Sequence, residues 1–88
     1  MLNRIFASRN PNDLLKELLK PTFNEEKINK IFSTGIDINW QDESKEGFLH
    51  FCAAKNLTQS LLWLIQNGAD IELEGKDGQT ALFYAVLS

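Results

Sequence analysis

The stretch GIDINWQDESKEGFLHFCAAKN, residues 35–56, resembles a second stretch of the same chain, GADIELEGKDGQTALFYA, residues 68–85. The two stretches begin 33 residues apart, at Gly35 and Gly68. With this 33-residue offset Asp37 falls on Asp70. The same offset, without a gap, pairs Ile28 with Leu61, Ile31 with Leu64, Phe32 with Ile65, Ile38 with Ile71, Leu49 with Leu82, Phe51 with Tyr84 and Cys52 with Ala85. A fixed period of this length is typical of repeat architectures, in which each unit buries its apolar face against its neighbours.

The first helical pattern of the chain is NPNDLLKELLK, residues 10–20. Asn10 is suited to cap the helix, and Pro11 to occupy its first position, where a missing N–H costs nothing. Pro21 ends the pattern, because the residue before a proline is disfavoured in the helical region. Its leucines form one apolar stripe: Leu14, Leu15, Leu18 and Leu19. We therefore predict a helix over residues 10–20.

Four further helices are predicted between polar, turn-rich segments. The second helix lies in TFNEEKINKIFSTG, residues 22–35. Thr22 and Glu25 match the spacing of a capping box, and Asn24 is an alternative cap. Gly35 is suited to the left-handed residue after this helix. The later helices are FLHFCAAK at 48–55, LTQSLLWLIQNG at 57–68 and TALFYAVLS at 80–88. Upstream, a short apolar turn is expected at Leu2, Ile5 and Phe6.

These repeated segments resemble the ankyrin repeat, whose unit is about 33 residues long and contains a β-turn and two helices. GIDIN, residues 35–39, and GADIE, residues 68–72, look like its closing motif. GFLHFCAAKN, residues 47–56, looks like the segment T-P-L-H-x-A-A-x-x-G, and DGQTALFYA, residues 77–85, looks like the next copy. The departures are Gly47 for Thr, Phe48 and Ala81 for Pro, Phe83 for His, and Gly75 for the opening Asp.

The resemblance implies an all-α fold, an ankyrin-type α-solenoid of helix pairs joined by extended β-turn or hairpin segments. We expect a single ankyrin-repeat domain over residues 1–88. Its parts are a degenerate N-terminal capping repeat at 1–41, a full repeat at 42–74 and an incomplete repeat at 75–88. The first repeat fits by position only, because Lys16 and Glu17 stand where the family has Leu and His.

Composition and charge narrow the class of protein. The 88 residues suffice for one small domain, and a net charge of −3 with scattered basic residues argues against nucleic acid and anionic membranes. The longest apolar run, LLWLI at residues 61–65, is far shorter than the ~20 residues of a spanning helix. A single cysteine allows no intrachain disulfide. We expect a soluble, cytoplasmic protein that binds neither nucleic acid nor membrane.

No catalytic, cofactor or metal site is predicted. His50 and Cys52, the single His and the single Cys, lie two residues apart on one predicted helix, so their side chains diverge by about 200°. Cys52 is expected to fill a small buried position, and the resemblance implies that His50 hydrogen-bonds turn backbone. We interpret the acidic residues of 24–27 as a helix N-terminus, those of 42–46 as a solvated hairpin tip, and residues 75–78 as a tight turn. The chain is predicted not to be an enzyme.

The resemblance implies a protein–protein interaction module with a concave face made of turn tips and first helices. The positions that vary with the partner in that family fall on Glu43, Ser44, Glu46, Ala54, Lys55, Lys76, Asp77 and Gln79. Trp40 lies beside them, and two interpretations stay open: it packs on the neighbouring repeat, or it projects as a binding anchor. Trp63 is expected to pack in the core or on the outer face of its helix rather than to form a site. Because the set is mostly acidic and polar, we expect a protein partner with some basic surface.

The last predicted helix carries an apolar edge formed by Leu82, Phe83, Val86 and Leu87. Burying three such side chains is worth roughly 5–8 kcal/mol, which is comparable with the whole stability of a small domain. Three interpretations are open: the chain is a fragment of a longer repeat protein, which we favour; it self-associates through this edge; or its last helix frays. An alternative function is an N-terminal regulatory segment of a larger enzyme or effector whose active site lies beyond Ser88.

Overall fold

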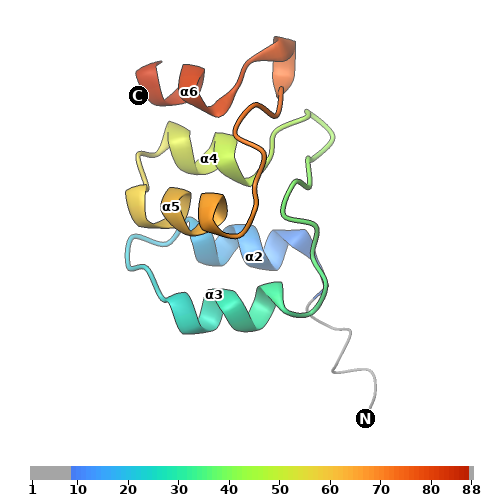
Figure 1. Cartoon of the computed structure of the whole chain (residues 1–88), viewed down its shortest axis with the longest axis vertical. Coiled ribbons are helices and arrows are strands. Elements are labelled where there is room, and N and C mark those ends of the chain that lie inside the picture. The colour runs from blue at the N-terminus through green and yellow to red at the C-terminus, as the bar shows by residue number, and fades with distance from the viewer. Residues whose placement is uncertain (1–8, 88) are drawn as a thin grey trace.

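A computed structural model describes residues 9–87, which form five α-helices and one 3-10 turn (Figure 1). Their bounds are α2 Pro11–Leu18, α3 Glu25–Phe32, α4 Phe48–Ala54, α5 Thr58–Gln66, η1 Lys76–Gly78 and α6 Ala81–Leu87. Within these residues, the β pairing is one isolated antiparallel bridge between Gln41 and Gly47. The five predicted helices and the all-α class are confirmed. The turn predicted at Leu2, Ile5 and Phe6 lies outside the described residues.

The helices stack along the long axis of the molecule, with α2 and α3 toward one end and α6 at the other (Figure 1). Helices α4 and α5 lie between them. The extended segments that follow α3 and α5 both run along the same side of the stack (Figure 1). The molecule is therefore a short solenoid of helix pairs, each followed by an extended segment.

Helix bounds and hydrogen bonds repeat with the 33-residue offset. This offset takes both the first and the last residue of α4 onto those of α6. The N–H of Asn39 donates to Asp37 Oδ1 at 2.9 Å, and the N–H of Glu72 donates to Asp70 Oδ1 at 2.9 Å. The gapless register found in the sequence is thus present in the backbone of both extended segments.

Two asparagines cap the first two helices. Asn10 Oδ1 accepts the N–H of Asn12 at 2.9 Å, which confirms the cap predicted for α2. Asn24 Oδ1 accepts the N–H of Lys27 at 3.1 Å and caps α3. The capping box predicted from Thr22 is therefore wrong, and the alternative cap is correct. Asn24 directly precedes the helix in extended conformation, so its short side chain reaches a free N–H of the first turn.

Left-handed residues follow three of the helices, and the one at Gly35 was predicted. Gly35 and Gly68 follow α3 and α5 with φ of 109° and 91°, which a residue with a Cβ rarely adopts. Asn56 follows α4 with φ of 56°, a conformation that asparagine tolerates better than most residues.

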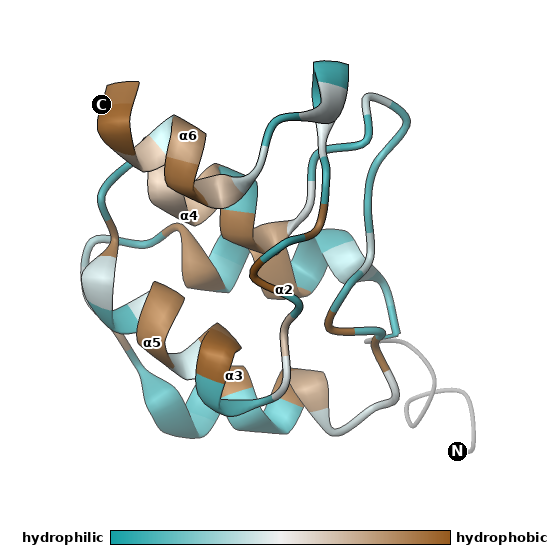
Figure 2. Ribbon diagram, turned by 45° about the horizontal axis from the view of Figure 1, so that its top comes forward, coloured by the Kyte–Doolittle hydropathy of each residue, from teal (hydrophilic) through white to brown (hydrophobic). Residues whose placement is uncertain are grey.

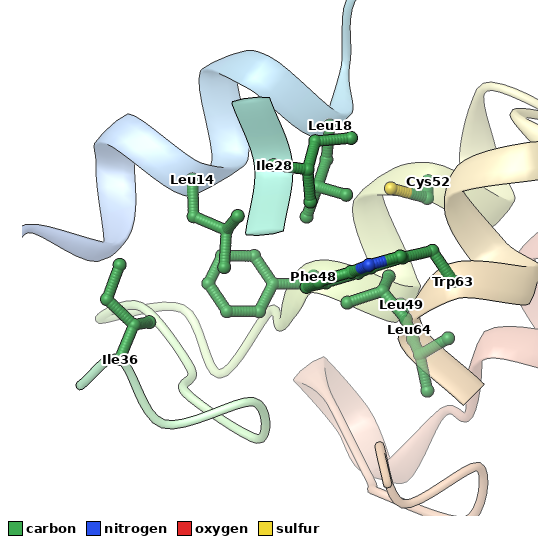
Figure 3. Packing of buried hydrophobic residues seen from close by; sticks show 9 residues of the cluster. All are labelled: Leu14, Leu18, Ile28, Ile36, Phe48, Leu49, Cys52, Trp63 and Leu64. Atoms are coloured by element: carbon green, nitrogen blue, oxygen red, sulfur yellow. The ribbon is translucent and has the colours of Figure 1, made fainter. Parts of the chain in front are cut away.

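The buried core lies between α2, α3, α4 and α5 (Figure 3). Its members are Leu14, Leu18, Ile28, Ile36, Phe48, Leu49, Cys52, Trp63 and Leu64. The Trp63 ring meets the Phe32 ring edge to face with centroids 5.3 Å apart, and its Nε1–H donates to Asn29 Oδ1 at 2.8 Å. The predicted packing role of Trp63 is confirmed. Helix α6 contributes no buried residue and is attached at the edge of this core.

Candidate protein-binding surface

Two turn tips are defined here: the first tip, residues 42–47, and the second tip, residues 75–80. In the first tip the N–H of Asp42 donates to the carbonyl of Glu46 at 2.9 Å. In the second tip the N–H of Gly75 donates to the carbonyl of Gln79 at 2.7 Å. The same backbone bond therefore closes both tips, at equivalent positions of successive repeats.

His50 joins the second extended segment to the first. Its Nδ1 accepts the N–H of Gly47 at 2.9 Å, and its Nε2 lies 3.1 Å from the carbonyl oxygens of both Leu73 and Gln79. Because Nδ1 accepts, Nε2 carries the proton and donates to these carbonyls. The side chain is 1% exposed. The prediction that His50 hydrogen-bonds turn backbone is confirmed.

Gln41 makes a second link between the tips. Its side-chain Nε2 donates to the carbonyl of Lys45 at 2.8 Å and to that of Glu74 at 2.8 Å. Glu74 stands at the equivalent position of the next repeat, 33 residues on. Gln41 and His50 together hold the backbones of the two tips at a fixed spacing.

A carboxylate of the first tip is tied to α6. The hydroxyl of Tyr84 donates to Glu46 Oε2, and Glu46 Oε1 lies 4.0 Å from His50 Nδ1. The hydrogen bond to Glu46, with smaller effects of burial and nearby carboxylates, raises the pKa of Tyr84 to about 12. These carboxylates belong to Glu46, Asp77 and Asp42. Each of these carboxylates favours the neutral hydroxyl of Tyr84 over its charged form.

The predicted partner-binding residues divide into two groups by exposure. Six are exposed: Glu43, Ser44, Ala54, Lys55, Lys76 and Asp77. Three are partly buried: Trp40, Glu46 and Gln79. The exposed charged side chains of the tips are thus available to a partner, whereas Glu46 is already engaged by Tyr84.

Beside the tips lies a pocket of about 370 Å³, here called the tip pocket. Two of its lining residues, Ala54 and Gln79, are among the predicted site residues. The others are Phe83, Tyr84 and Leu87. Phe83 and Leu87 were predicted only as part of the apolar edge, and Tyr84 was not predicted as a site residue. The sequence indicated this pocket at one position: Phe83 places an apolar ring where the ankyrin family has histidine.

Trp40 packs against the core. Its ring lies 5.3 Å from the ring of the buried Phe48, centroid to centroid, at an interplanar angle of 38°. Trp40 is partly buried and contacts the core cluster. This contact supports the packing interpretation, and a binding role for Trp40 stays a prediction.

The Cys52 thiol lies in the core, where burial raises its pKa to about 12. It is therefore protonated at neutral pH, whereas a nucleophilic cysteine needs the thiolate form. Among residues 9–87, no group of three or more His, Cys, Asp and Glu side chains is arranged to hold a metal ion. The helices in that part of the chain are all too short to be candidates for crossing a membrane.

Comparison with known proteins agrees with this geometry. The family profile for ankyrin repeats, in three copies, matches residues 5–88. The chain belongs to the ankyrin repeat family. It is also 31% identical over 85 residues to calmodulin-binding transcription activator 3 of Arabidopsis thaliana. That match covers 97% of this ankyrin-repeat chain but only 8% of the activator's length. Ankyrin repeats are in general protein–protein interaction modules.

Two departures from the ankyrin pattern have a steric explanation in the structure. A Cβ atom at Gly75 would lie 2.8 Å from His50 Nε2 and 3.0 Å from Glu46 Oε1. A Cβ atom at Gly47 would lie 3.0 Å from the carbonyl oxygen of Trp40. Glycine at position 75 lets the second tip approach His50 and Glu46, and glycine at position 47 leaves room for the carbonyl of Trp40 just before the first tip.

Four of the seven large hydrophobic residues that are exposed within residues 9–87 lie on α6, and the hydrophobic residues of α5 and α6 are plain in Figure 2. The exposed fractions are 73% for Leu82, 41% for Phe83, 74% for Val86 and 71% for Leu87. These four residues are the predicted apolar edge, and they are exposed as predicted. Exposed apolar groups of this extent commonly mark sites of protein contact.

Proposed function

We propose that this ankyrin-repeat chain is a non-catalytic protein-binding module whose partner contacts the first tip, the second tip and the tip pocket. One observation carries the proposal: Gln41 and His50 fix the backbones of both tips while four of the predicted partner-binding side chains of the tips stay exposed. Those side chains are Glu43, Ser44, Lys76 and Asp77. A preorganised surface lowers the entropy cost of association. Side chains that the fold does not require are free to match a partner.

The charge of the tips supports a partner with some basic surface. The two tips together carry four carboxylates and only two ammonium groups. The carboxylates belong to Asp42, Glu43, Glu46 and Asp77, and the ammonium groups to Lys45 and Lys76. The tip pocket beside them is lined largely by apolar atoms of Phe83, Leu87 and Ala54. The complementary ligand is therefore a protein segment with an apolar side chain next to lysine or arginine.

The predicted self-association belongs to the same proposal. A standard interface buries about 800 Å² on each partner. The four exposed side chains of the apolar edge offer apolar surface that a second copy would bury. The cytoplasmic location also stays a proposal, supported by the free thiol of Cys52, which suits a reducing compartment.

Site-specific photo-crosslinking tests the proposal in cells that express the protein. A benzophenone amino acid is placed at Glu43 or Lys76, and at Lys30 on the exposed face of α3 as the matched control. We expect a discrete protein adduct from both tip positions and none from Lys30. Adducts of equal yield from all three positions, or from Lys30 alone, would overturn the proposed surface.

The two wider interpretations stay predictions: a fragment of a longer repeat protein, or the regulatory N-terminal segment of a larger enzyme or effector. The codons that follow Ser88 test them both. A reading frame that continues into further repeats supports the first interpretation, and one that continues into a catalytic domain supports the second.

A further inference from the structure

The backbone of the first tip is held by a side chain. Asp42 Oδ1 accepts the N–H of Ser44 at 2.8 Å and the N–H of Glu46 at 2.9 Å. An aspartate that bonds the backbone two residues further on forms an Asx turn, which fixes the conformation of a tight turn. The carboxylate of Asp42 therefore restrains the residues at the end of the first tip.

The second tip lacks this restraint. Gly75 stands at the position of Asp42, 33 residues further on, and has no carboxylate to offer. The structure explains the replacement, since a Cβ atom at Gly75 would lie 2.8 Å from His50 Nε2. The close approach of the second tip to His50 thus excludes the side chain that would hold this tip in the manner of the first.

The turn at residues 76–78 is held by two backbone hydrogen bonds instead. The N–H of Gly78 donates to the carbonyl of Gly75 at 3.1 Å, and the N–H of Gln79 donates to the carbonyl of Lys76 at 3.2 Å. The side-chain links between the two tips reach residues that flank this turn and not the turn itself. Few bonds therefore need to break for the turn to open locally.

Asp77 lies in this turn in a left-handed conformation, with φ of 60° and ψ of 26°. Such a conformation is unfavourable for a residue with a side chain, so local opening of the turn relieves it. The carboxylate of Asp77 is exposed and, within residues 9–87, accepts no hydrogen bond. The next residue is Gly78, which has no side chain to shield its backbone nitrogen.

An aspartate followed by glycine can react with its own backbone. The nitrogen of Gly78 attacks Cγ of the protonated Asp77 carboxyl, a C–N bond forms, and the C–OH bond breaks. The hydroxyl leaves with the amide proton as water, which closes a five-membered succinimide. Water then adds to one ring carbonyl and breaks its bond to nitrogen. Cleavage at Cγ restores aspartate, whereas cleavage at the main-chain carbonyl leaves isoaspartate. One water leaves and one enters, so the reaction needs no co-reactant.

The sequence contains one other residue pair of this reactivity, Asn67–Gly68. Asn67 Nδ2 donates to the carbonyl of Trp63 at 2.8 Å, and the N–H of Gly68 donates to the carbonyl of Ile65 at 3.1 Å. These bonds hold the amide side chain and the attacking nitrogen at the end of α5. The fold therefore restrains the side chain of Asn67, whereas that of Asp77 is unrestrained.

We propose that Asp77 is a site of spontaneous isomerisation to isoaspartate, because the second tip lacks the carboxylate that holds the first. This inference goes beyond the proposed function, and the reaction does not depend on it. Isomerisation adds one methylene to the main chain of the second tip and leaves mass and net charge unchanged. It moves both the backbone and the carboxylate of Asp77 on the proposed binding surface. The product is a substrate for methyltransferases that esterify isoaspartate.

A matched pair of sites within one molecule tests the proposal. The double variant Ser44→Asp with Lys45→Gly places the same dipeptide at the equivalent position of the first tip, where Asp42 still bonds the backbone. Lys45 has φ of 67°, so glycine fits there without strain. Parent and variant are incubated at neutral pH and physiological temperature. Isoaspartate is measured by isoaspartyl methyltransferase labelling and assigned to each position by chromatography and mass spectrometry of proteolytic fragments.

In the double variant we expect isoaspartate to accumulate at Asp77 at least threefold faster than at the new site in the first tip. Adding Asp42→Ala removes the restraining carboxylate and should bring the rate at the first tip to within twofold of that at Asp77. Asp77→Glu should abolish the label at the second tip, because glutamate would have to close a larger ring. Circular dichroism confirms that each variant is folded.

A ratio below threefold between the two tips of the double variant would overturn the proposal. So would an absence of isoaspartate at Asp77 in the parent chain under conditions in which a free peptide of residues 73–81 forms it. A rate at the first tip that Asp42→Ala leaves unchanged would overturn the role given to this carboxylate. None of these outcomes affects the crosslinking test, which examines the proposed function separately.

Discussion

His50 links the backbones of the two extended segments and so helps to set the spacing of the two tips. It is buried on α4, and each of its ring nitrogens bonds backbone of a different segment. The resemblance predicted that His50 would bond turn backbone. It could not identify Leu73 and Gln79 as the acceptors, because their carbonyls reach His50 only once two repeats are stacked. The role of this residue was therefore predictable, and its partners were not.

Replacing His50 by alanine should destabilise the chain by about 2–4 kcal/mol, since the buried N–H of Gly47 and two carbonyls lose their partner and a cavity remains. Urea unfolding followed by circular dichroism measures the change. Lys55→Ala, at the exposed end of the same helix, is the control and should change the free energy of unfolding by less than about 0.5 kcal/mol. A loss below about 1 kcal/mol for His50→Ala would contradict the assigned role.

Tyr84 provides a pH-dependent test of the link between the first tip and α6. Its pKa is raised from 10.0 to about 12, chiefly by its hydrogen bond to Glu46. A raised pKa means that the neutral hydroxyl stabilises the fold. That contribution is complete below about pH 10 and is lost as the pH rises through about 12.

Ultraviolet absorbance of tyrosinate reports this titration directly, because the chain contains one tyrosine. We expect a midpoint well above 10 in the parent chain and a midpoint close to 10 in Glu46→Ala. Asp77→Asn is the matched control and should lower the midpoint less, since Asp77 contributes less to the shift than Glu46 does. A parent midpoint at 10 would show that the bond to Glu46 does not persist in solution.

At the scale of elements, apolar periodicity and left-handed residues were sufficient to predict the five helices. Two details were not decidable from the pattern. Thr22 and Asn24 both precede α3 at plausible capping positions, and only the backbone conformation selects Asn24. Helix α2 begins earlier than the repeat offset from α4 would place it, because the connection from α2 to α3 is longer than the one from α4 to α5. A connection of variable length leaves no periodic signal.

The cap of α3 gives the prediction that belongs to this scale. Asn24→Ala removes the acceptor of the Lys27 N–H and should destabilise the chain by about 1 kcal/mol. Thr22→Ala tests the rejected cap and should have an effect near zero. The comparison uses thermal and urea unfolding of both variants. A larger loss of stability for Thr22→Ala than for Asn24→Ala would contradict Asn24 as the cap of α3.

At the scale of the whole molecule, the repeat period predicted that α4 and α6 would be equivalent, and with them the two tips. Only some of the residues that line the tip pocket were predicted as partner-binding residues. Ala54 and Gln79 were named from family positions, whereas Phe83, Tyr84 and Leu87 line it because α6 packs beside the end of α4. Distances across repeats decide such a pocket, and a linear pattern does not contain them.

The exposed apolar edge leads to a prediction about association. Light scattering of the 10.0 kDa chain should show a mass that rises toward twice that value with concentration. The double variant Val86→Ser with Leu87→Ser should keep the mass near 10.0 kDa, because both residues are more than 70% exposed on the edge. Leu62→Ser, exposed on α5 away from the edge, is the control and should associate like the parent. A parent mass that stays at the monomer value at every concentration would contradict self-association.

The stacking of α6 beside α4 underlies both the tip surface and the tip pocket. Nuclear Overhauser spectroscopy tests it most directly, because the chain has one histidine and one tyrosine whose ring centroids lie 5.2 Å apart. The account predicts cross-peaks between the ring protons of His50 and Tyr84 in the 88-residue chain. Assigned rings with no cross-peak between them would contradict it.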